Sequence, residues 1–315
     1  MPAAEAPLII VLNAGSGRDD AADARRTIED VLREAGREFR LLLVEDASRL
    51  REVAQRAVAE AGSCDGIVVA AGGDGTINAV AQAAHGGRRV LGVVPQGTFN
   101  LFGRTHGIPL DTALATRMLL DAQVEPVQVG LVNDRLFLVN ASLGLYPRLL
   151  EDREAFKQQY GRSRWVAAWA ALKTVFGEHR PLSIRIERKG SISDLRTPTL
   201  FVGNNRLQLE RIGIREADAL DEGQLAAVTL RNVGTRSLLW LMLRGALGQL
   251  GDADGIISFG FTRMTVRPRL ALGVRRIKVA LDGEVLSLTP PIEFRVSPEP
   301  LALLKPRARA DAAAA

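Results

Sequence analysis

A glycine-rich loop between a buried strand and a helix is the feature that most constrains this chain. Residues 66–71 form an apolar run, and Gly72-Gly73-Asp74-Gly75-Thr76 follows before a helical pattern begins at 77. A strand that is apolar on both faces is typical of a parallel sheet covered by helices on both sides. The glycines let the backbone turn tightly and approach a ligand, and the free N–H groups at the helix start favour a phosphate. The alternative is an ordinary glycine-rich turn that binds no ligand and in which Asp74 caps the helix.

The first 125 residues repeat this alternation of strand and helix. The predicted strands are 8–12, 39–44, 66–71 and 90–94, and the predicted helices end near 35 and span 50–61 and 77–84. The apolar side chains of 50–61 recur at helical spacing along one face. The sequence therefore predicts an α/β N-terminal lobe with a parallel sheet, spanning residues 1–126.

Two more loops rich in small residues follow predicted strands. They are Asn13-Ala14-Gly15-Ser16-Gly17 and Pro95-Gln96-Gly97-Thr98-Phe99-Asn100. Because the carboxyl ends of parallel strands meet at one edge, where such folds bind ligands, we expect the three loops to surround one site. A carboxylate there would repel a bare phosphate, so Asp74 indicates Mg²⁺ as the neutralising cation. The chain has no GxxxxGK[ST], which excludes a P-loop NTPase, and no GxGxxG with a later acidic residue, which disfavours a dinucleotide dehydrogenase.

After residue 126 the pattern changes to short strands separated by turns. A hairpin is predicted over 127–139 around Asn133-Asp134. Further strands are predicted at 182–187, 199–202, 225–230, 264–266, 277–281, 285–288 and 292–296, with helices at 164–176 and 238–250. This arrangement predicts an all-β antiparallel sandwich lobe over 127–305, with a flexible tail at 306–315.

The composition excludes several classes of protein. Cys64 is the only cysteine, so no internal disulfide can form. A Cys/His zinc site is disfavoured, because structural zinc needs four such ligands and the chain has only one cysteine and three histidines. No signal-peptide pattern opens the chain, and no apolar stretch reaches the ~20 residues of a membrane span. No basic run with interleaved aromatic residues indicates nucleic acid. We expect a cytoplasmic protein whose net charge of +5 either attracts anionic lipid or nucleotide or simply solvates the surface.

The order and spacing of these segments resemble the diacylglycerol kinase catalytic-domain family, the bacterial lipid kinases related to sphingosine kinases. Besides the three loops, Asn140-Ala141-Ser142-Leu143-Gly144 and Asp282-Gly283-Glu284 carry the resemblance, which runs from about residue 8 to 304. GGDGT alone is shared with NAD kinases and phosphofructokinases, whereas the full set in this order is more specific. The resemblance implies a nucleotide lobe, a β-sandwich lobe and an active site in the cleft between them.

The resemblance also implies a reaction: transfer of the γ-phosphoryl group of ATP, with Mg²⁺, to a hydroxyl of diacylglycerol or a related long-chain lipid. The implied nucleotide-binding residues are Asn13, Gly15, Ser16, Gly17, Gly72, Gly73, Asp74, Gly75, Thr76, Ile77, Asn78, Gly97 and Thr98. Asp74 would lie close to Mg²⁺, and Glu284 would be the general base that takes the proton of the lipid hydroxyl. Without the resemblance, Asp282-Gly283 between two apolar strands predicts only a hairpin turn.

Four positions depart from the family pattern. Leu101 stands where an Asp usually follows the PxGTxN loop, and residues 41–44 lack the Thr that often contacts ATP. Asp221-Glu222-Gly223 replaces an Asp-Asp-Gly that often holds a second Mg²⁺, which leaves Asp221 and Glu222 as the candidate ligands. Residues 205–210 replace a glycine-rich stretch near the expected lipid entrance. These differences leave open the details of nucleotide binding, the second metal and the substrate.

Two apolar segments are candidates for contact with lipid. Trp165, Trp169, Leu172 and Phe176 recur at helical spacing, for which a core face is the alternative, and 238–250 resembles an interfacial helix flanked by basic residues. We expect a lipid substrate at a membrane surface with peripheral association at its inner face, and a homodimer is left open. A kinase of a soluble substrate, such as NAD or a sugar phosphate, and a catalytically weak lipid- or nucleotide-binding regulator remain alternatives.

Overall fold

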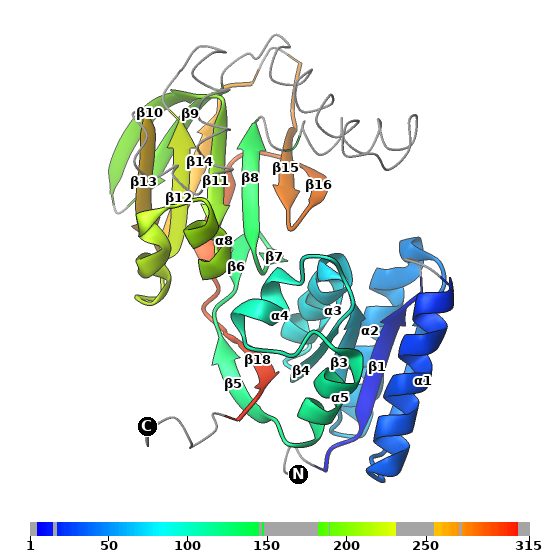
Figure 1. Ribbon diagram of the computed structural model, residues 1–315. Coiled ribbons are helices and arrows are strands. Elements are labelled where there is room, and N and C mark those ends of the chain that lie inside the picture. Colours follow the sequence, from blue (N-terminus) through cyan, green and yellow to red (C-terminus); the bar gives the residue numbers. More distant parts are fainter. Residues whose placement is uncertain are drawn as a thin grey trace, which may run out of the picture. The chain divides into compact units, whose positions relative to one another are not determined.

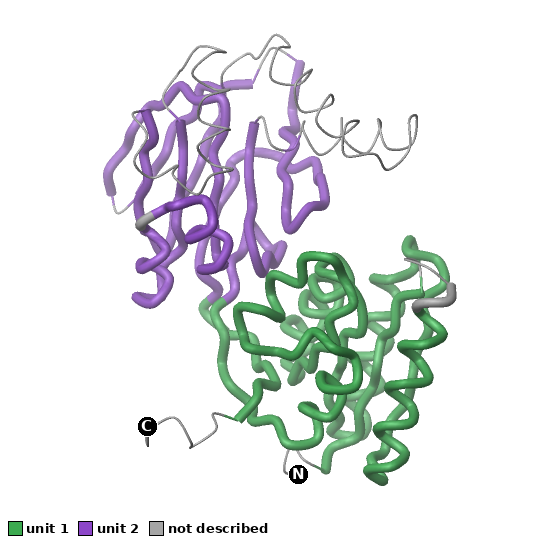
Figure 2. The backbone as a smooth tube through the Cα atoms, viewed as in Figure 1, with its two compact units in different colours: residues 1–128, 298–315 green, residues 129–297 purple. Residues whose placement is uncertain are grey.

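The structure is a computed structural model that describes residues 5–14, 18–144, 147, 182–188, 190–230, 255–270 and 273–307 of the 315-residue chain. The chain divides into two compact units (Figure 2). Residues 1–128 and 298–315 form unit 1, and residues 129–297 form unit 2.

Unit 1 is built on a six-stranded sheet with the order β2-β1-β3-β4-β18-β5 (Figure 1). Its strands are β1 (Leu8–Asn13), β2 (Phe39–Val44), β3 (Ile67–Gly72), β4 (Leu91–Pro95), β5 (Gln123–Val127) and β18 (Leu301–Lys305). β2, β1, β3, β4 and β18 are parallel, and β5 pairs antiparallel with β18. β3 is buried along its whole length, as its continuous apolar sequence requires. The predicted α/β lobe with a parallel sheet is confirmed.

Helices cover both faces of this sheet. They are α1 (Arg18–Glu34), α2 (Leu50–Ser63), α3 (Asp74–Gly86), α4 (Leu101–Thr105) and α5 (Thr112–Leu120), with a short 3₁₀ turn, η1 (Ala47–Arg49). α1 packs with α5, and α2 packs with α3, as Figure 1 shows for the two layers. Ile28 of α1 and Leu119 of α5 join Ile10 and Val69 in one buried core. Asp111 caps α5 by accepting a hydrogen bond from the Leu114 N–H at 2.8 Å.

Unit 2 contains two antiparallel sheets. One has the order β10-β9-β14-β17-β6-β7, and the other has the order β13-β12-β11-β8-β15-β16. The first comprises β6 (Gly130–Val132), β7 (Arg135–Phe137), β9 (Leu182–Arg188), β10 (Ser191–Thr197), β14 (Arg263–Pro268) and β17 (Ile292–Val296). The second comprises β8 (Asn140–Gly144), β11 (Thr199–Gly203), β12 (Leu225–Leu230), β13 (Ile256–Phe261), β15 (Ile277–Leu281) and β16 (Glu284–Leu288). Their apolar side chains form one core that includes Leu143, Val279 and Phe294, which confirms the predicted all-β antiparallel lobe.

The domain limits differ from those expected. The sequence predicts residues 298–305 as part of the β lobe, whereas β18 lies in the sheet of unit 1, where it pairs with β4 and β5. An apolar strand such as 301–304 carries no local sign of the sheet it joins, because pairing partners are set by the fold. The break lies at 128 and not at 126.

Some expected elements cannot be compared with the structure. Gly15, Ser16 and Gly17, both segments proposed to contact lipid (164–176 and 238–250) and most of the tail lie outside the described residues. Within the described part of the chain, no helix is both long enough and apolar enough to cross a membrane.

Candidate functional site

The glycine-rich loop of unit 1 has the predicted strand–loop–helix geometry. β3 ends at Gly72, Gly73 is extended, and α3 begins at Asp74. A Cβ on Gly72 would lie 2.7 Å from the Thr76 side chain, so a larger residue would displace it. A Cβ on Gly97 would lie 2.9 Å from the Gly73 Cα. The loops after β3 and β4 therefore meet backbone to backbone, and only glycine permits this approach.

Hydrogen bonds hold the three strand-end segments together. The Gln96 N–H donates to the Gly72 carbonyl at 2.9 Å, which joins the loops after β4 and β3. Asn13, the last residue of β1, donates its side-chain N–H to the Thr76 hydroxyl at 2.9 Å. The structure thus gathers the ends of β1, β3 and β4 at one edge of the sheet, as the sequence predicts.

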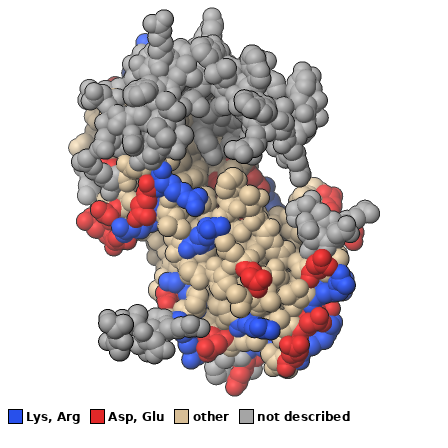
Figure 3. All heavy atoms as spheres, in the orientation of Figure 1, with Lys and Arg blue, Asp and Glu red and all other residues tan. Residues whose placement is uncertain are grey.

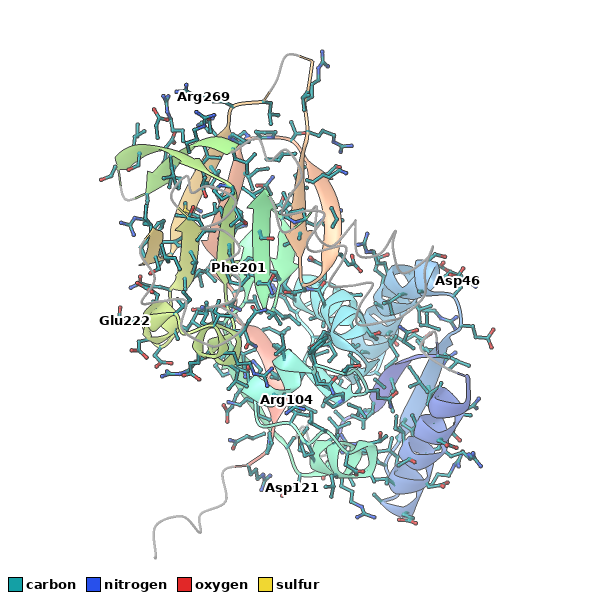
Figure 4. The ribbon with its side chains drawn as sticks, turned by 45° about the horizontal axis from the view of Figure 1, so that its top comes forward. Asp46, Arg104, Asp121, Phe201, Glu222 and Arg269 are labelled. Atoms are coloured by element: carbon teal, nitrogen blue, oxygen red, sulfur yellow. The ribbon has the colours of Figure 1, made fainter. Side chains whose placement is uncertain are left out.

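Asn100 closes the loop after β4, a role that the sequence did not reveal. Its side-chain oxygen accepts from the Gly97 N–H at 2.8 Å, and its amide donates to the Gly97 carbonyl at 2.7 Å. Asn100 is buried and has φ = 49°, a left-handed conformation that Asn tolerates better than most residues. Arg104 of α4, labelled in Figure 4, donates its Nε–H to the Phe99 carbonyl at 3.0 Å. The loop is therefore held in one shape from both sides.

The Asp74 carboxylate is the most unusual group at this edge. Burial raises its pKa, and the backbone N–H groups of Phe102, Asn100 and Leu101 offset part of that rise. Its Oδ1 atom is buried and has no hydrogen-bond partner in the described structure. A buried carboxylate oxygen without a donor fits a hard cation such as Mg²⁺.

Asp74 would be the protein ligand of such an ion, and phosphate and water oxygens would complete its coordination. Within the described part of the chain, no group of three or more His, Cys, Asp or Glu side chains is placed to hold a metal. Mg²⁺ at nucleotide sites is commonly held by one or two carboxylates together with phosphates and water, so the arrangement fits such an ion.

The predicted nucleotide-binding residues differ in what they can present to a ligand. The side chains of Thr76 and Ile77 are buried, so these two residues can offer a ligand only their backbone. Gly75 and Thr98 are exposed, and Asn78 is half-buried. The Gln96 Nε2 atom is buried without a hydrogen-bond partner in the described structure and adds a donor that the sequence analysis missed.

Two pockets flank the end of β2. One has a volume of about 280 Å³ and is lined by Ala14, Ala21, Ala22, Arg25, Leu43 and Glu45. The other, of about 390 Å³, is lined by residues 41–46, which include Asp46 (Figure 4), with Arg49, Val53 and Arg56. The first pocket contains Ala14, next to Asn13, and therefore opens beside the gathered strand ends.

In unit 2, Asp282-Gly283-Glu284 forms the predicted hairpin between β15 and β16. Asp282 and Gly283 have φ = 46° and φ = 92°, as a two-residue hairpin turn with two left-handed positions requires. The Asp282 carboxylate accepts from the N–H groups of Leu138 (2.7 Å), Val139 (2.9 Å) and Asn140 (2.8 Å). Asp282 therefore anchors the turn to the start of β8, while Glu284 is exposed.

The acidic pair Asp221 and Glu222 does not fit a second divalent ion. Arg206, the first residue of α8 (Arg206–Arg211), pairs with Asp221 and also lies 3.1 Å from Asp218 and 2.6 Å from Glu210. Glu222 (Figure 4) accepts a hydrogen bond from the Gln224 side chain at 2.9 Å. A guanidinium carries the positive charge that a metal would supply. It ties α8 to the 3₁₀ turn η2 (Arg215–Leu220).

Comparison with known proteins relates the chain to one family. Residues 7–132 match the model of the diacylglycerol kinase catalytic domain. The "Probable lipid kinase YegS-like" protein of Pseudomonas aeruginosa (strain UCBPP-PA14) is 31% identical over 273 residues, which is 84% of each chain. A diacylglycerol kinase of Staphylococcus aureus (strain MRSA252) is 27% identical over 249 residues, covering 76% of this chain and 75% of the other.

The fold is also found in solved structures. The crystal structure of a diacylglycerol kinase from Bacillus anthracis str. Sterne superposes with a TM-score of 0.67 at 18% identity, covering 96% of this chain and 97% of the other. At this identity the similarity concerns the fold alone.

Proposed function

Since the chain belongs to the diacylglycerol kinase family, and is thus a kinase, we propose that it transfers the γ-phosphoryl group of ATP to a hydroxyl of diacylglycerol or a related long-chain lipid. The observation that supports this most directly is the Asp74 carboxylate, whose buried Oδ1 has no hydrogen-bond partner in the described structure. It lies at the edge of the sheet where the ends of β1, β3 and β4 meet. That combination of free backbone N–H groups and one carboxylate suits a metal–nucleotide complex.

Unit 1 is proposed to hold the nucleotide. The N–H groups of Gly73, Gly75 and Thr98 would face the phosphates, and Asp74 would hold Mg²⁺. When bound, this ion neutralises charge on the phosphates during transfer. The Gln96 amide can donate to a phosphate oxygen, since its Nε2 has no partner in the described structure. The pocket beside Ala14 and Leu43 would take the nucleoside, with Leu43 giving an apolar contact where a Thr hydroxyl is absent.

Unit 2 is proposed to supply the base. Glu284 is exposed at the start of β16, on a turn that Asp282 fixes through three backbone N–H groups. Its carboxylate would accept the proton of the lipid hydroxyl while that oxygen bonds to the γ-phosphorus and the bond to the β-phosphate oxygen breaks, releasing ADP. A rigid turn limits how far the carboxylate can move from the hydroxyl that it serves.

A transfer assay tests the proposal. The pure protein is incubated with γ-labelled ATP, Mg²⁺ and a lipid extract, and the organic phase is counted for label. A lipid kinase predicts that label enters the organic phase with the wild type, and at less than about a tenth of that rate with Asp74→Asn. Label that stays in a water-soluble product would instead establish a kinase of a soluble substrate. Nucleotide binding without any transfer would establish a regulator.

A lipid substrate also implies where in the cell the protein acts. We propose that the protein acts in the cytoplasm and binds peripherally to the inner face of the membrane, where its substrate lies.

A further inference from the structure

The connection between β14 and β15 concentrates positive charge. Residues 267–278 contain Arg267, Arg269, Arg275, Arg276 and Lys278 and no Asp or Glu. Gly273 has φ = 84°, and it begins a run of four exposed residues that ends at Arg276. Within this run Val274 is an apolar side chain with 49% of its surface exposed. The described residues of the connection therefore present cations and the apolar side chain of Val274 at the surface.

A neighbouring strand adds to this charge at the same end of the sandwich. The Arg269 N–H donates to the Ser183 carbonyl at 2.7 Å, and Ser183 of β9 pairs with Arg196 of β10. Figure 4 shows Arg269 at this end, where β14 finishes. The basic end of unit 2 comprises four arginines: Arg196, Arg269, Arg275 and Arg276.

Most of these charges are not neutralised within the described structure. Asp194 pairs with Arg185 at 3.0 Å and lies 3.7 Å from Arg269. No carboxylate of the described residues lies within ion-pair distance of Arg196, Arg275 or Arg276. By contrast with the basic end, the face of unit 1 seen in Figure 3 carries acidic and basic side chains side by side. On α1, for example, Glu29 pairs with Arg25 at 2.7 Å and with Arg33 at 2.5 Å.

We propose that the basic end of unit 2 is a docking surface for an anionic lipid bilayer. Charge complementarity argues for this partner, because each Arg near an anionic membrane surface contributes about 1 kcal/mol, or roughly fivefold in affinity. Val274 can enter the headgroup layer beside the guanidinium groups. Nucleic acid is a poorer match, because 267–278 contains no aromatic side chain on which bases could stack. The inference rests on the proposed function, since a lipid substrate is what gives such docking a purpose.

Docking here is separable from the chemistry. β15 runs from Ile277, beside the basic end, to Leu281, beside the Asp282-Gly283 turn. At about 3.3 Å per residue the strand separates the two by roughly 17 Å. Charge reversal at Arg275 and Arg276 should therefore leave Glu284 and its turn undisturbed.

Vesicle sedimentation tests the proposal with matched variants. Arg275→Glu/Arg276→Glu is compared with Arg117→Glu/Arg211→Glu, which changes net charge equally at two exposed arginines on α5 and α8. The wild type and the control should bind phosphatidylglycerol vesicles better than phosphatidylcholine vesicles. The test variant should bind phosphatidylglycerol vesicles at least about tenfold more weakly. Binding should also fall as salt rises from about 0.1 M to about 1 M, because the Debye length shrinks from ~10 Å to ~3 Å.

Three results would overturn the proposal: equal losses in both variants, equal binding to neutral and anionic vesicles, or tighter binding to a DNA oligonucleotide than to anionic vesicles. Arg196→Glu gives an independent test on a different strand, should the double variant fold poorly. Kinase activity is also measured with a short-chain diacylglycerol in detergent micelles. If the test variant keeps normal activity in micelles but binds vesicles weakly, the docking surface is supported. If the wild type is inactive in micelles, the proposed function is rejected, and the vesicle experiment still tests the docking surface on its own.

Discussion

At the scale of single residues, the role proposed for Asp74 has a consequence for stability. Burial raises its pKa above the value of 3.8 that it has when unfolded. Ionising it therefore costs more in the folded protein, and the free energy of unfolding falls as pH rises from the unfolded pKa through the folded one. At neutral pH the nucleotide-free protein carries this cost in full. A buried carboxylate that destabilises the free protein is typical of a residue retained for a ligand.

We predict that Asp74→Asn lowers phosphoryl transfer to less than about a tenth of the wild-type rate at saturating Mg²⁺, since a neutral amide is a weaker metal ligand. The same variant should melt a few degrees higher at pH 7, because about 1 kcal/mol shifts the melting temperature by ~2–4 °C in a chain of this size. Calorimetry without nucleotide and the label-transfer assay measure the two effects. Near-normal turnover would remove Asp74 from the metal site, and a lower melting temperature would contradict the cost of its charge.

His106 gives a second prediction at this scale. Burial lowers its pKa to about 4 from 6.5, and its ring packs edge-on against Phe102 at 4.6 Å. Between pH 6.5 and pH 4 the unfolded chain binds a proton that the folded chain does not, so stability falls as pH falls through this window. In His106→Leu this loss should shrink by roughly 1–2 kcal/mol, allowing for partial exposure of the ring. Denaturant titrations at pH 7 and pH 4.5 compare the two proteins, and identical pH dependence would contradict the prediction.

At the scale of elements, the sequence pattern predicts strands that are buried along their whole length and misses strands that are mostly exposed. β3 is buried throughout, and its apolar run predicts it directly. β10 was not predicted, because five of its seven residues are exposed and its sequence is polar. It exists because its backbone pairs with β9 over seven residues, a long-range cause that no local pattern records. β18 was placed in the other lobe for the same reason.

The contact between α8 and η2 also joins residues that are distant in sequence. It predicts how this part of the protein responds to a divalent cation. The Arg206 guanidinium lies between the carboxylates of Glu210, Asp218 and Asp221 and pairs with all three. All three carboxylates are partly exposed. Without nucleotide, Ca²⁺ should leave the melting temperature of the wild type unchanged. Arg206→Ala should melt only slightly lower than the wild type, because exposed ion pairs are weak, and Ca²⁺ should reverse this loss because the three carboxylates become free.

Scanning calorimetry with Ca²⁺ and with chelator measures this difference, and Arg206→Lys is the control that keeps the charge. Stabilisation of the wild type by Ca²⁺ that disappears in Asp221→Asn would show a metal at this place after all.

At the scale of the whole molecule, each unit carries its own candidate residues, and the sequence predicts these two sets unequally. The three strand-end loops could be predicted, because parallel topology alone places strand ends at one edge. The roles of Gln96 and Asp282 could not be predicted, because each depends on a backbone group that only the fold brings near. The partner of Asn100, Gly97, is close in sequence, but their contact depends on the left-handed backbone of Asn100, which the sequence does not show. Within Asp282-Gly283-Glu284, the sequence shows two carboxylates but not which one the backbone uses.

The last prediction separates those two carboxylates. Asp282→Ala leaves the N–H groups of Leu138, Val139 and Asn140 without their acceptor, and each unmet buried donor costs about 1–3 kcal/mol. Unit 2 should therefore lose roughly 3 kcal/mol or more. Glu284→Gln keeps the shape of an exposed side chain and its capacity to hydrogen-bond, so its melting temperature should stay within about 1 °C of the wild type.

Turnover should respond in the opposite way if Glu284 is the base. Glu284→Gln removes the proton acceptor, and turnover should fall by roughly 10²–10⁴, the usual contribution of general base catalysis. Nucleotide affinity should stay unchanged, because Glu284 belongs to unit 2 and the loops proposed to hold the nucleotide belong to unit 1. If Glu284 were only a hairpin residue, turnover would stay near normal. If turnover and melting temperature both collapsed, Glu284 would be structural and Asp74 would be the first alternative base. Label transfer, nucleotide titration and calorimetry on the same preparation distinguish these three outcomes.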